Sequence, residues 1–323
     1  MKKVSIIIPV YNEAESLSSL VMAVSNAMQP TGRPFELILV DDGSADTSQT
    51  ILAGLEDEYP WLRCFGLIRN YGQSTALQAG FDQATGDYVV TLDGDLQNDP
   101  ADIPAMIQIL EDDSSIDCVS GWRKSRQDAT LTRKLPSKFA NALISWVTKV
   151  RLRDYGCALK AYRSTIIQNI KLYGELHRFI PALAVEVGGR ICEIPVNHRP
   201  RVAGSSHYGL DRTIRVLLDL LWIWFMTRFL HRPIHAFGGV AIVLLFIGGG
   251  ILTWLLFEKF GLGYEIGGRP ALIFGALVTL IGFQFLGIGL IGELLTRVYH
   301  EPQGRKQYIL SQRFSNKLKL FNE

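Results

Sequence analysis

Residues 87–97 read DYVVTLDGDLQ, an apolar run that ends in two carboxylates one residue apart. The β-branched and aromatic residues at 88–91 predict a buried strand. In an extended chain residues i and i+2 point to the same side, so Asp93 and Asp95 converge, and Gly94 leaves room for a ligand to approach them. Buried carboxylates are costly without a partner. The stretch therefore predicts a strand that ends in a binding site; the alternative is a solvated Asp-Gly turn without a ligand.

The same alternation of strand and helix runs through the first part of the chain. Apolar strands are predicted at 4–11, 35–43, 63–70, 87–95 and 116–123, and helices at 16–28, 46–59, 73–84 and 100–112. Near-continuous apolar strands separated by helices indicate a mostly parallel sheet with both faces covered, a Rossmann-like α/β domain that we place at residues 1–210. Ligands of such sheets bind beyond the carboxyl ends of the strands.

Polar residues follow each predicted strand at that edge. They are Asn12, Glu13, Asp41, Asp42, Arg69, Asn70, Asp93, Asp95 and Arg123. One acid at one strand end needs no explanation, but a row of polar groups along one edge predicts a site. Residues 1–210 contain neither GxGxxG nor GxxxxGK[ST], so phosphate must be held there by a metal or by side chains.

Bulk composition excludes several other kinds of function. The 323 residues carry a net charge of +2, so no nucleic-acid partner is expected. The four cysteines include no CxxC pair, which argues against a zinc site or a disulfide framework and fits a reducing compartment.

Two stretches near the C-terminus, 233–257 and 270–292, contain no Asp, Glu, Lys or Arg. Each exceeds the roughly 20 residues that a helix needs to cross a bilayer core of about 30 Å. We predict membrane-spanning helices at 233–257 and 270–295, joined by the short non-cytoplasmic loop 258–269; the alternative is a pair of buried core helices. Basic residues flank the hairpin on its outer sides, so both termini, the α/β domain and the tail 296–323 are predicted to be cytoplasmic.

Two further segments are predicted to lie on the membrane surface. Within 134–150, apolar residues recur every three or four positions, which is typical of an amphipathic interfacial helix or of an ordinary helix facing the core. Within 211–232, charged residues four apart precede a cluster of Trp and Phe, and Trp is enriched at membrane interfaces. We predict an interfacial helix there.

Five motifs stand in order along the chain: PVYNE at 9–13, DDGS at 41–44, RNYGQ at 69–73, DGDLQ at 93–97 and SGWR at 120–123. Together they resemble the GT-A glycosyltransferases of family 2. With the two apolar stretches, nearly the whole chain resembles the polyprenyl-phosphate branch, which includes relatives of dolichol-phosphate mannose synthase, bacterial polyprenyl-phosphate glucosyltransferases and undecaprenyl-phosphate aminoarabinose transferase. The resemblance implies a nucleotide-sugar donor, Mg²⁺ or Mn²⁺, a polyprenyl-phosphate acceptor, inversion at C1 and homo-oligomers, with tetramers as one form.

The resemblance also implies roles for individual residues on the donor side. It places the nucleotide-sugar against Pro9, Tyr11, Glu13, Asp42, Asp93 and Gln97, and the metal on Asp93 and Asp95. Carboxylates accept hydrogen bonds from a base imide or a ribose hydroxyl, and oxygen ligands suit Mg²⁺ or Mn²⁺ bridging a diphosphate. For Asp41 and Asp42 the alternative is turn chemistry before Gly43.

On the acceptor side, a lipid phosphate with roughly −1.5 to −2 charges needs a cationic cradle more than a base. The expected acceptor-phosphate residues are Arg123, Arg126, Arg133 and Ser137, and the expected catalytic residues are Asp95, Arg123 and Asp154. The alternative for the basic residues is a solvated face or attraction to anionic lipids. Asp154 is either a base, a residue that positions the acceptor, or a structural Asp before a Gly turn.

One motif departs from the relatives. Residues 204–209 read GSSHYG where relatives often have G-x-S-K-Y, so His207 replaces a lysine. If that loop closes over phosphates, contact becomes partly pH-dependent; a passive histidine is equally compatible with the sequence.

We therefore expect a membrane-bound enzyme of the cell envelope that moves a hexose from a nucleotide-sugar, with UDP-glucose favoured, to a polyprenyl phosphate. Two alternatives stay open. One is a non-catalytic scaffold that binds a nucleotide-sugar at the membrane. The other is a processive polysaccharide synthase, whose relatives usually carry QxxRW and more spans than this chain has.

Overall fold

The computed structural model describes residues 1–124, 144, 145, 148, 150–172, 174, 176–199 and 233–300, with side chains in the last range from 237 to 292. The described residues divide into two compact units, an α/β domain within 1–199 and a helical pair within 233–300. Most of the predicted helix at 134–150, all of the one at 211–232, the GSSHYG loop with His207 and the tail beyond 300 lie outside these residues.

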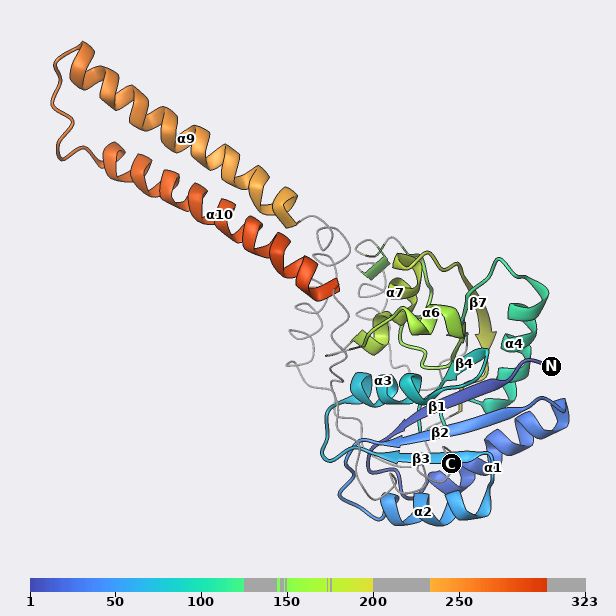
Figure 1. Ribbon diagram of the computed structural model, residues 1–323. Helices are drawn as coiled ribbons and strands as arrows, with labels where there is room; N and C mark the ends of the chain where they lie inside the picture. Colours follow the sequence, from blue (N-terminus) through green and yellow to red (C-terminus); the bar gives the residue numbers. More distant parts are fainter. Residues whose placement is uncertain are drawn as a thin grey trace. The chain divides into compact units, whose positions relative to one another are not determined.

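A seven-stranded sheet forms the centre of the α/β domain (Figure 1). Its strands are β1 Val4–Val10, β2 Phe35–Asp41, β3 Leu62–Gly66, β4 Tyr88–Thr91, β5 Cys118–Arg123, β6 Lys160–Arg163 and β7 Ile191–Val196. They pair in the order β3-β2-β1-β4-β6-β5-β7. Strands β1 to β4 are parallel, β7 is parallel to β5, and β6 is antiparallel to both of its neighbours.

The prediction of a mostly parallel α/β sheet is confirmed, with two additional strands. The five strands expected from the sequence are present, and their carboxyl ends reach one edge as expected. Strand β6 was not predicted and makes the sheet mixed, because it enters between β4 and β5 in the opposite direction. Strand β7 was not predicted either; it is an edge strand whose Pro195 and polar residues break the apolar run that marks a central strand.

Helices cover both faces of this sheet (Figure 1). They are α1 Leu17–Met28, η1 Gln29–Thr31, α2 Ser48–Glu58, α3 Gln73–Gln83, η2 Pro100–Asp102, α4 Ile103–Asp112, α6 Ser164–Gln168, η3 Leu176–Phe179 and α7 Ile180–Glu186. Helices α1, α2 and α4 share one apolar core with Ile6 and Ile8 of β1. Ile7 of the same strand faces α3, where Gly80 leaves the space that the Ile7 side chain fills. Burial on both faces explains why these strands are apolar at consecutive positions.

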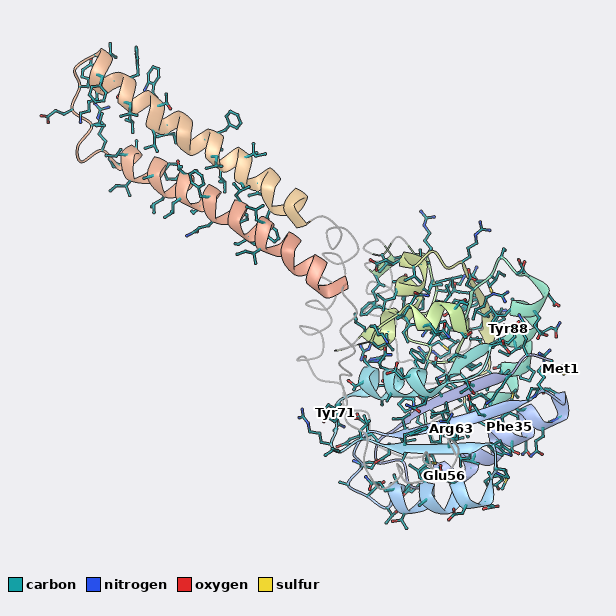
Figure 2. All side chains as sticks on the ribbon, in the orientation of Figure 1. Met1, Phe35, Glu56, Arg63, Tyr71 and Tyr88 are labelled. Atoms are coloured by element: carbon teal, nitrogen blue, oxygen red, sulfur yellow. The ribbon has the colours of Figure 1, made fainter. Side chains whose placement is uncertain are left out.

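The second unit is a pair of long apolar helices, α9 Pro233–Gly261 and α10 Pro270–His300, packed against each other. Side chains project outward along both helices (Figure 2), and most of the exposed ones are apolar. Segments Phe237–Gly261 and Pro270–Gly292 are long and apolar enough to cross a membrane. Helix α9 continues four residues past the predicted end of the first span at 257.

Glycines let the two helices approach closely. A Cβ on Gly275 would lie 2.9 Å from Ile251 Cγ2, and a Cβ on Gly282 would lie 2.9 Å from Leu245 Cγ. Small residues at such contacts allow helix backbones to pack in an apolar environment. Near the connector, Arg269 pairs with Glu258 and so ties the end of α9 to the start of α10.

Candidate active site

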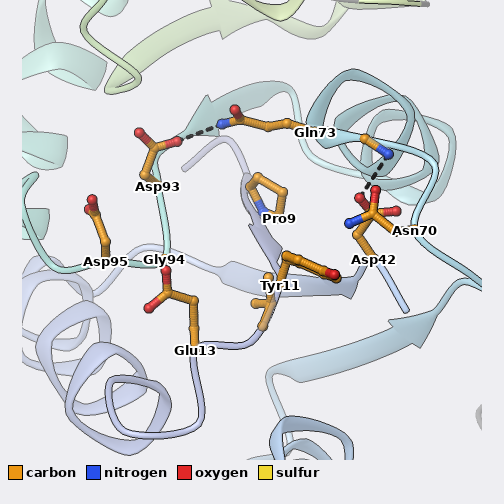
Figure 3. A pocket seen from close by; sticks show the side chains of 11 residues that line it. Pro9, Tyr11, Glu13, Asp42, Asn70, Gln73, Asp93, Gly94 and Asp95 are labelled. Carbon is orange, nitrogen blue, oxygen red and sulfur yellow. Dashed lines mark hydrogen bonds between the residues drawn. The ribbon is translucent and has the colours of Figure 1, made fainter. Parts of the chain in front are cut away.

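A pocket of about 300 Å³ opens where β1, β2 and β4 end (Figure 3). Its lining consists of Pro9, Val10, Tyr11, Glu13, Asp42, Asn70, Gly72, Gln73, Asp93, Gly94 and Asp95. Five of the six residues predicted to bind the nucleotide-sugar are among them, and so are both predicted metal ligands. The carboxyl ends of three parallel strands thus bring together residues that are up to 86 positions apart, from 9 to 95.

The two carboxylates of the DGD motif lie on one side of this pocket (Figure 3). Gln73 Nε2, at the start of α3, donates a hydrogen bond to Asp93 Oδ1 at 2.7 Å. Burial and repulsion from Asp95 raise the pKa of Asp93 to about 6, although the positive charges of Lys160 and Arg123 oppose this rise. The site is therefore short of positive charge when both carboxylates are ionised.

This donor set fits a hard divalent cation. Carboxylate oxygens are the ligands that Mg²⁺ and Mn²⁺ take, and a cation between Asp93 and Asp95 would relieve their repulsion. Within the described residues, no group of three or more His, Cys, Asp or Glu side chains is placed to hold a metal ion. The pair therefore fits a cation that takes its other ligands from substrate or water.

The turn that carries Asp95 is conformationally strained. Leu96 has φ of +59°, a left-handed conformation that is uncommon outside glycine. Asp95 Oδ1 accepts a hydrogen bond from Gln97 N at 3.1 Å, which closes the turn. The pocket lining does not include Gln97, so in the described residues this predicted ligand contributes to the turn and not to the pocket surface.

The two aspartates of the DDGS motif have different hydrogen-bond partners. Asp42 lines the pocket, and its two oxygens accept hydrogen bonds from Tyr71 N at 2.7 Å and Gly72 N at 2.8 Å. Burial raises the pKa of Asp42, and these two N–H groups oppose the rise. Asp41 instead accepts from Gln49 Nε2 at 2.9 Å. The turn interpretation agrees with the contacts of Asp41, while Asp42 shapes the pocket wall.

Two residues in left-handed conformations bring the surrounding loops together. Gly43 has φ of +70°, and a Cβ there would lie 2.7 Å from Arg69 Cα, so only glycine allows this approach. Asn12 has φ of +54°, and its N donates to Ser44 Oγ at 2.9 Å. These contacts hold the loop of Tyr11 at the rim of the pocket, where the tyrosine is 47% exposed.

The predicted catalytic residues Arg123 and Asp154 contact each other. Arg123 Nε donates to Asp154 Oδ2 at 2.6 Å and Nη2 donates to Oδ1 at 2.9 Å, and the side chains are only 12% and 9% exposed. Burial opposes the charge of Arg123, but Asp154 outweighs burial and raises the pKa of Arg123. A carboxylate held in a two-point ion pair is a poor base, so the positioning interpretation of Asp154 fits this geometry better. Arg126, Arg133 and Ser137 lie outside the described residues.

A buried lysine that the sequence analysis did not select lies beside these groups. Lys160 of β6 is 2% exposed, and its ammonium donates to the carbonyl of Cys157. Burial lowers the pKa of Lys160, and its charge acts on both Asp93 and Asp154. The available signal was a single lysine inside the apolar strand pattern CALKAY at 157–162, since a buried charge needs partners.

Curated relatives align with nearly the full chain. A dodecaprenyl-phosphate galacturonate synthase of Rhizobium johnstonii is 44% identical over 317 residues, which cover 97% of this chain and 94% of that protein. An undecaprenyl-phosphate 4-deoxy-4-formamido-L-arabinose transferase of Salmonella typhimurium is 37% identical over 314 residues, with the same two coverages. The corresponding transferase of Klebsiella pneumoniae is 40% identical over 311 residues, covering 96% and 93%.

A solved structure shares the fold at low sequence identity. Glucosyl-3-phosphoglycerate synthase from Mycobacterium tuberculosis, in complex with Mn²⁺, UDP and glucosyl-3-phosphoglycerate, superposes with a TM-score of 0.54 at 16% identity, covering 70% of this chain and 80% of that one. The family model described as glycosyl transferase family 2 matches residues 5–178, the part that carries the pocket. By this match and by its full-length relatives, the chain belongs to glycosyl transferase family 2.

Proposed function

We propose that this protein transfers a sugar from a UDP-sugar to a polyprenyl phosphate at a membrane surface. The observation that carries the proposal is the carboxylate pair Asp93 and Asp95, placed in a pocket at the carboxyl edge of the sheet together with Asp42 and Tyr11. Relatives named for transfer to a polyprenyl phosphate align with 97% of the chain. The intact carboxylate pair argues against the scaffold alternative.

On the donor side, the base and ribose would lie against Tyr11, Glu13 and Asp42, and the diphosphate would approach Asp93 and Asp95. These two carboxylates would hold Mg²⁺ or Mn²⁺, which when bound neutralises charge on the departing nucleoside diphosphate. UDP complexes with Mn²⁺ in the solved structure of similar fold support UDP over GDP and a divalent metal. Gln73 keeps Asp93 in place through its hydrogen bond.

On the acceptor side, the phosphate is already an anionic nucleophile, so the protein has to place it and needs no strong base. One acceptor oxygen attacks C1 of the sugar, the bond from C1 to the diphosphate oxygen breaks, and UDP leaves with the electron pair, which inverts C1. Arg123 would stabilise the acceptor phosphate, and Asp154 would hold the Arg123 guanidinium in position. Arg126, Arg133 and Ser137 stay predictions for the same cradle.

The identity of the transferred sugar is the most specific part of the proposal. The family resemblance favoured UDP-glucose, whereas the relative at 44% identity is named for galacturonate and others are named for 4-deoxy-4-formamido-L-arabinose. Because the relative at 44% identity aligns with 97% of the chain, we rank its named sugar first, as UDP-galacturonic acid, and UDP-glucose second.

The helical pair α9 and α10 would anchor the enzyme where its acceptor lies. Both helices are long and apolar enough to span, and basic residues on the outer flanks favour cytoplasmic termini. A polyprenyl phosphate keeps its head group at the bilayer surface, so a catalytic domain tethered by two spans meets it there. Homo-oligomers, including tetramers, stay a prediction from the family resemblance.

The test uses the purified full chain in detergent with undecaprenyl phosphate and radiolabelled UDP-galacturonic acid, UDP-glucose, a UDP-4-deoxy-4-formamido-arabinose and GDP-mannose. We expect label in the butanol-extractable lipid with Mn²⁺ or Mg²⁺ and none with EDTA. Asp95→Asn should lower the rate at least ~100-fold, and the exposed Glu58→Gln on α2 serves as its control. Binding of UDP without transfer from any donor would support the scaffold, and repeated addition to one acceptor would support the processive synthase.

A further inference from the structure

The last described segment of the α/β domain contacts two loops on different sides of the active site. We call residues 193–199 the strap; it comprises the last four residues of β7 and the three residues that follow them. Strand β7 lies at the edge of the sheet beside β5. The first two residues of β7 pair with β5, and the strap adds side-chain and backbone bonds to segments far away in the sequence.

At its C-terminal end the strap holds the loop that follows the carboxylate pair. The carbonyl of Gln97 accepts from Arg199 N at 2.9 Å and lies 3.0 Å from His198 Nδ1. The Arg199 guanidinium donates to Asp99 Oδ2 through Nε at 3.1 Å and Nη2 at 2.7 Å. The strap therefore fixes the chain two and four residues after Asp95, next to the left-handed turn at Leu96.

Asn197 extends the same contact to the start of α4. Asn197 N donates to Asp102 Oδ2 at 2.7 Å, and Asn197 Nδ2 donates to Asp102 Oδ1 at 2.9 Å. Asn98 and His198 form an isolated antiparallel bridge between these two bonded points. The whole stretch between Asp95 and α4 is thus held by three consecutive strap residues.

At its N-terminal end the strap holds the acceptor side. Glu193 Oε1 accepts from Arg153 N at 2.8 Å and from Asp154 N at 3.4 Å. Asp154 in turn binds the Arg123 guanidinium through the two-point ion pair. The Arg153 guanidinium stacks on the ring of Trp122, 4.5 Å from its centre. The residues next to Asp154 and Arg123 therefore form a second contact between the same two segments.

We propose that residues 193–199 act as a positioning strap that keeps the metal-binding loop and Arg123 in register with each other. This rests on the proposed function, because Asp95 belongs to the donor side and Arg123 to the acceptor side of one transfer. Reacting atoms must come within about 3–3.5 Å, and a misplacement of about 1 Å can cost a hundredfold in rate. The strained turn at Leu96 also needs surrounding contacts to persist.

The strap has two ends, so its role can be separated from simple stabilisation of the fold. Arg199→Ala removes the guanidinium bonds to Asp99 in the donor loop and keeps the backbone bond to Gln97. Glu193→Ala removes only the contact to the acceptor side. Glu193→Gln keeps an acceptor oxygen for the two backbone N–H groups. Arg190→Ala is the matched control, because Arg190 is exposed just before β7 and bonds Asp117 and Cys118 through its backbone N and O, which alanine keeps.

The experiment measures each end with its own ligand on the full chain in detergent. Calorimetric titration of UDP with Mn²⁺ reports the donor loop, and the KM for undecaprenyl phosphate, with the UDP-sugar that the wild type transfers, reports the acceptor side. We expect Arg199→Ala to weaken UDP–Mn²⁺ binding ~10-fold with the acceptor KM unchanged, and Glu193→Ala to raise the acceptor KM ~10-fold with UDP binding unchanged. Glu193→Gln and Arg190→Ala should resemble the wild type.

Two results would overturn the strap. One is unchanged binding and KM in both alanine variants, and the other is an equal loss of both quantities in each variant, in step with a lower unfolding midpoint. Failure of the proposed function looks different, because the wild type itself then transfers no sugar. In that case, hydrogen exchange still tests whether the strap holds the donor loop. If it does, the amides of residues 93–99 should exchange ~10-fold faster in Arg199→Ala than in Arg190→Ala. Equal exchange rates in the two variants would contradict the strap.

Discussion

Two carboxylate clusters lie at opposite edges of the parallel part of the sheet, one buried at the start of β2 and one partly buried after β4. At the start of β2, Glu36 accepts hydrogen bonds from Ser5 Oγ at 2.6 Å and from Thr85 N at 2.8 Å, and it pairs with Lys3 and with Arg63, which is labelled in Figure 2. Just after β4, Asp93 receives a hydrogen bond from Gln73 and has a second carboxylate, Asp95, beside it. The pKa of Glu36 is lowered to about 2, and that of Asp93 is raised to about 6.

Burial alone does not explain this difference, since burial raises the pKa at both sites. At Glu36, hydrogen bonds from Ser5, Thr85 and Lys3 outweigh burial. At Asp93, repulsion from Asp95 adds to burial. The fold supplies Glu36 with its counter-charges and makes it structural, whereas it leaves the carboxyl edge with a surplus of negative charge that a ligand has to balance. Such a surplus in a pocket is typical of a functional site.

The strongest test of this contrast is Asp93→Asn. Under the proposed function, removing one charge of the pair should lower the transfer rate at least ~100-fold, because the site would lose a metal ligand and the stabilisation of the leaving group that the metal would supply. The free energy of unfolding should stay the same or rise, because repulsion from Asp95 disappears. Transfer of label into lipid and urea denaturation of the full chain in detergent, followed by near-UV circular dichroism, give the two values.

A lower free energy of unfolding in Asp93→Asn than in the wild type would contradict this contrast. It would mean that Asp93 is held by the fold as Glu36 is, and that its charge is balanced without a ligand. Asp112→Asn on α4, an exposed carboxylate bonded to Gln108 of the same helix, controls for the chemical change itself.

The converse variant is Glu36→Gln. It should lower the free energy of unfolding by about 2–3 kcal/mol, since it breaks a buried ion pair whose cationic partners, Lys3 and Arg63, are partly exposed and regain water. The rate per folded molecule should not change, because Glu36 lies at the end of β2 away from the pocket. The same urea titration, with transfer measured below the transition, tests both statements; a slower rate at full folding would contradict them.

The two clusters also differ in how far the sequence predicts them. Asp93 and Asp95 follow an apolar run and share a motif, so local pattern is enough to predict a site at that strand end. Glu36 stands alone at the start of FELILV, and its partners lie at positions 3, 5, 63 and 85. No local pattern indicates which distant groups will surround one acid, so this cluster was not predicted.

On the acceptor side, too, the sequence did not predict contacts between distant residues. Arg123 and Asp154 were both predicted from motifs, but their pairing was not, because 31 residues separate them and β6 returns in the opposite direction after them. Glu193 and Arg199 were missed because β7 is an edge strand with weak apolar periodicity. Periodicity reports which residues are buried in a regular element, and long-range polar contacts carry no such signal.

The contrast predicts an acid-sensitive stability at the structural end. Because the pKa of Glu36 is about 2 in the folded chain and 4.5 as its ordinary value, ionised Glu36 stabilises the fold above pH 4.5, and this contribution is lost as the pH falls toward 2. The difference in unfolding free energy between wild type and Glu36→Gln should therefore shrink by about 2 kcal/mol between pH 6 and pH 3. Urea titrations of both proteins at several pH values measure it, and a constant difference would show that hydrogen-bond geometry and not charge holds Glu36.

The smallest expected effect compares the glycines before and after β2. Gly32 has φ of +63° with open space where a Cβ would be, and Gly43 has φ of +70° with the backbone of Arg69 and Asn70 less than 3 Å from that position. Gly32→Ala should cost about 1 kcal/mol, the penalty of a left-handed non-glycine residue. Gly43→Ala should cost about 1 kcal/mol more and should also weaken UDP–Mn²⁺ binding, because the loop at 69–72 that bonds Asp42 has to move. Equal losses in the two variants, with equal UDP binding, would mean that this loop adapts freely, and that the carboxyl edge is less rigidly built than the carboxylate pair requires.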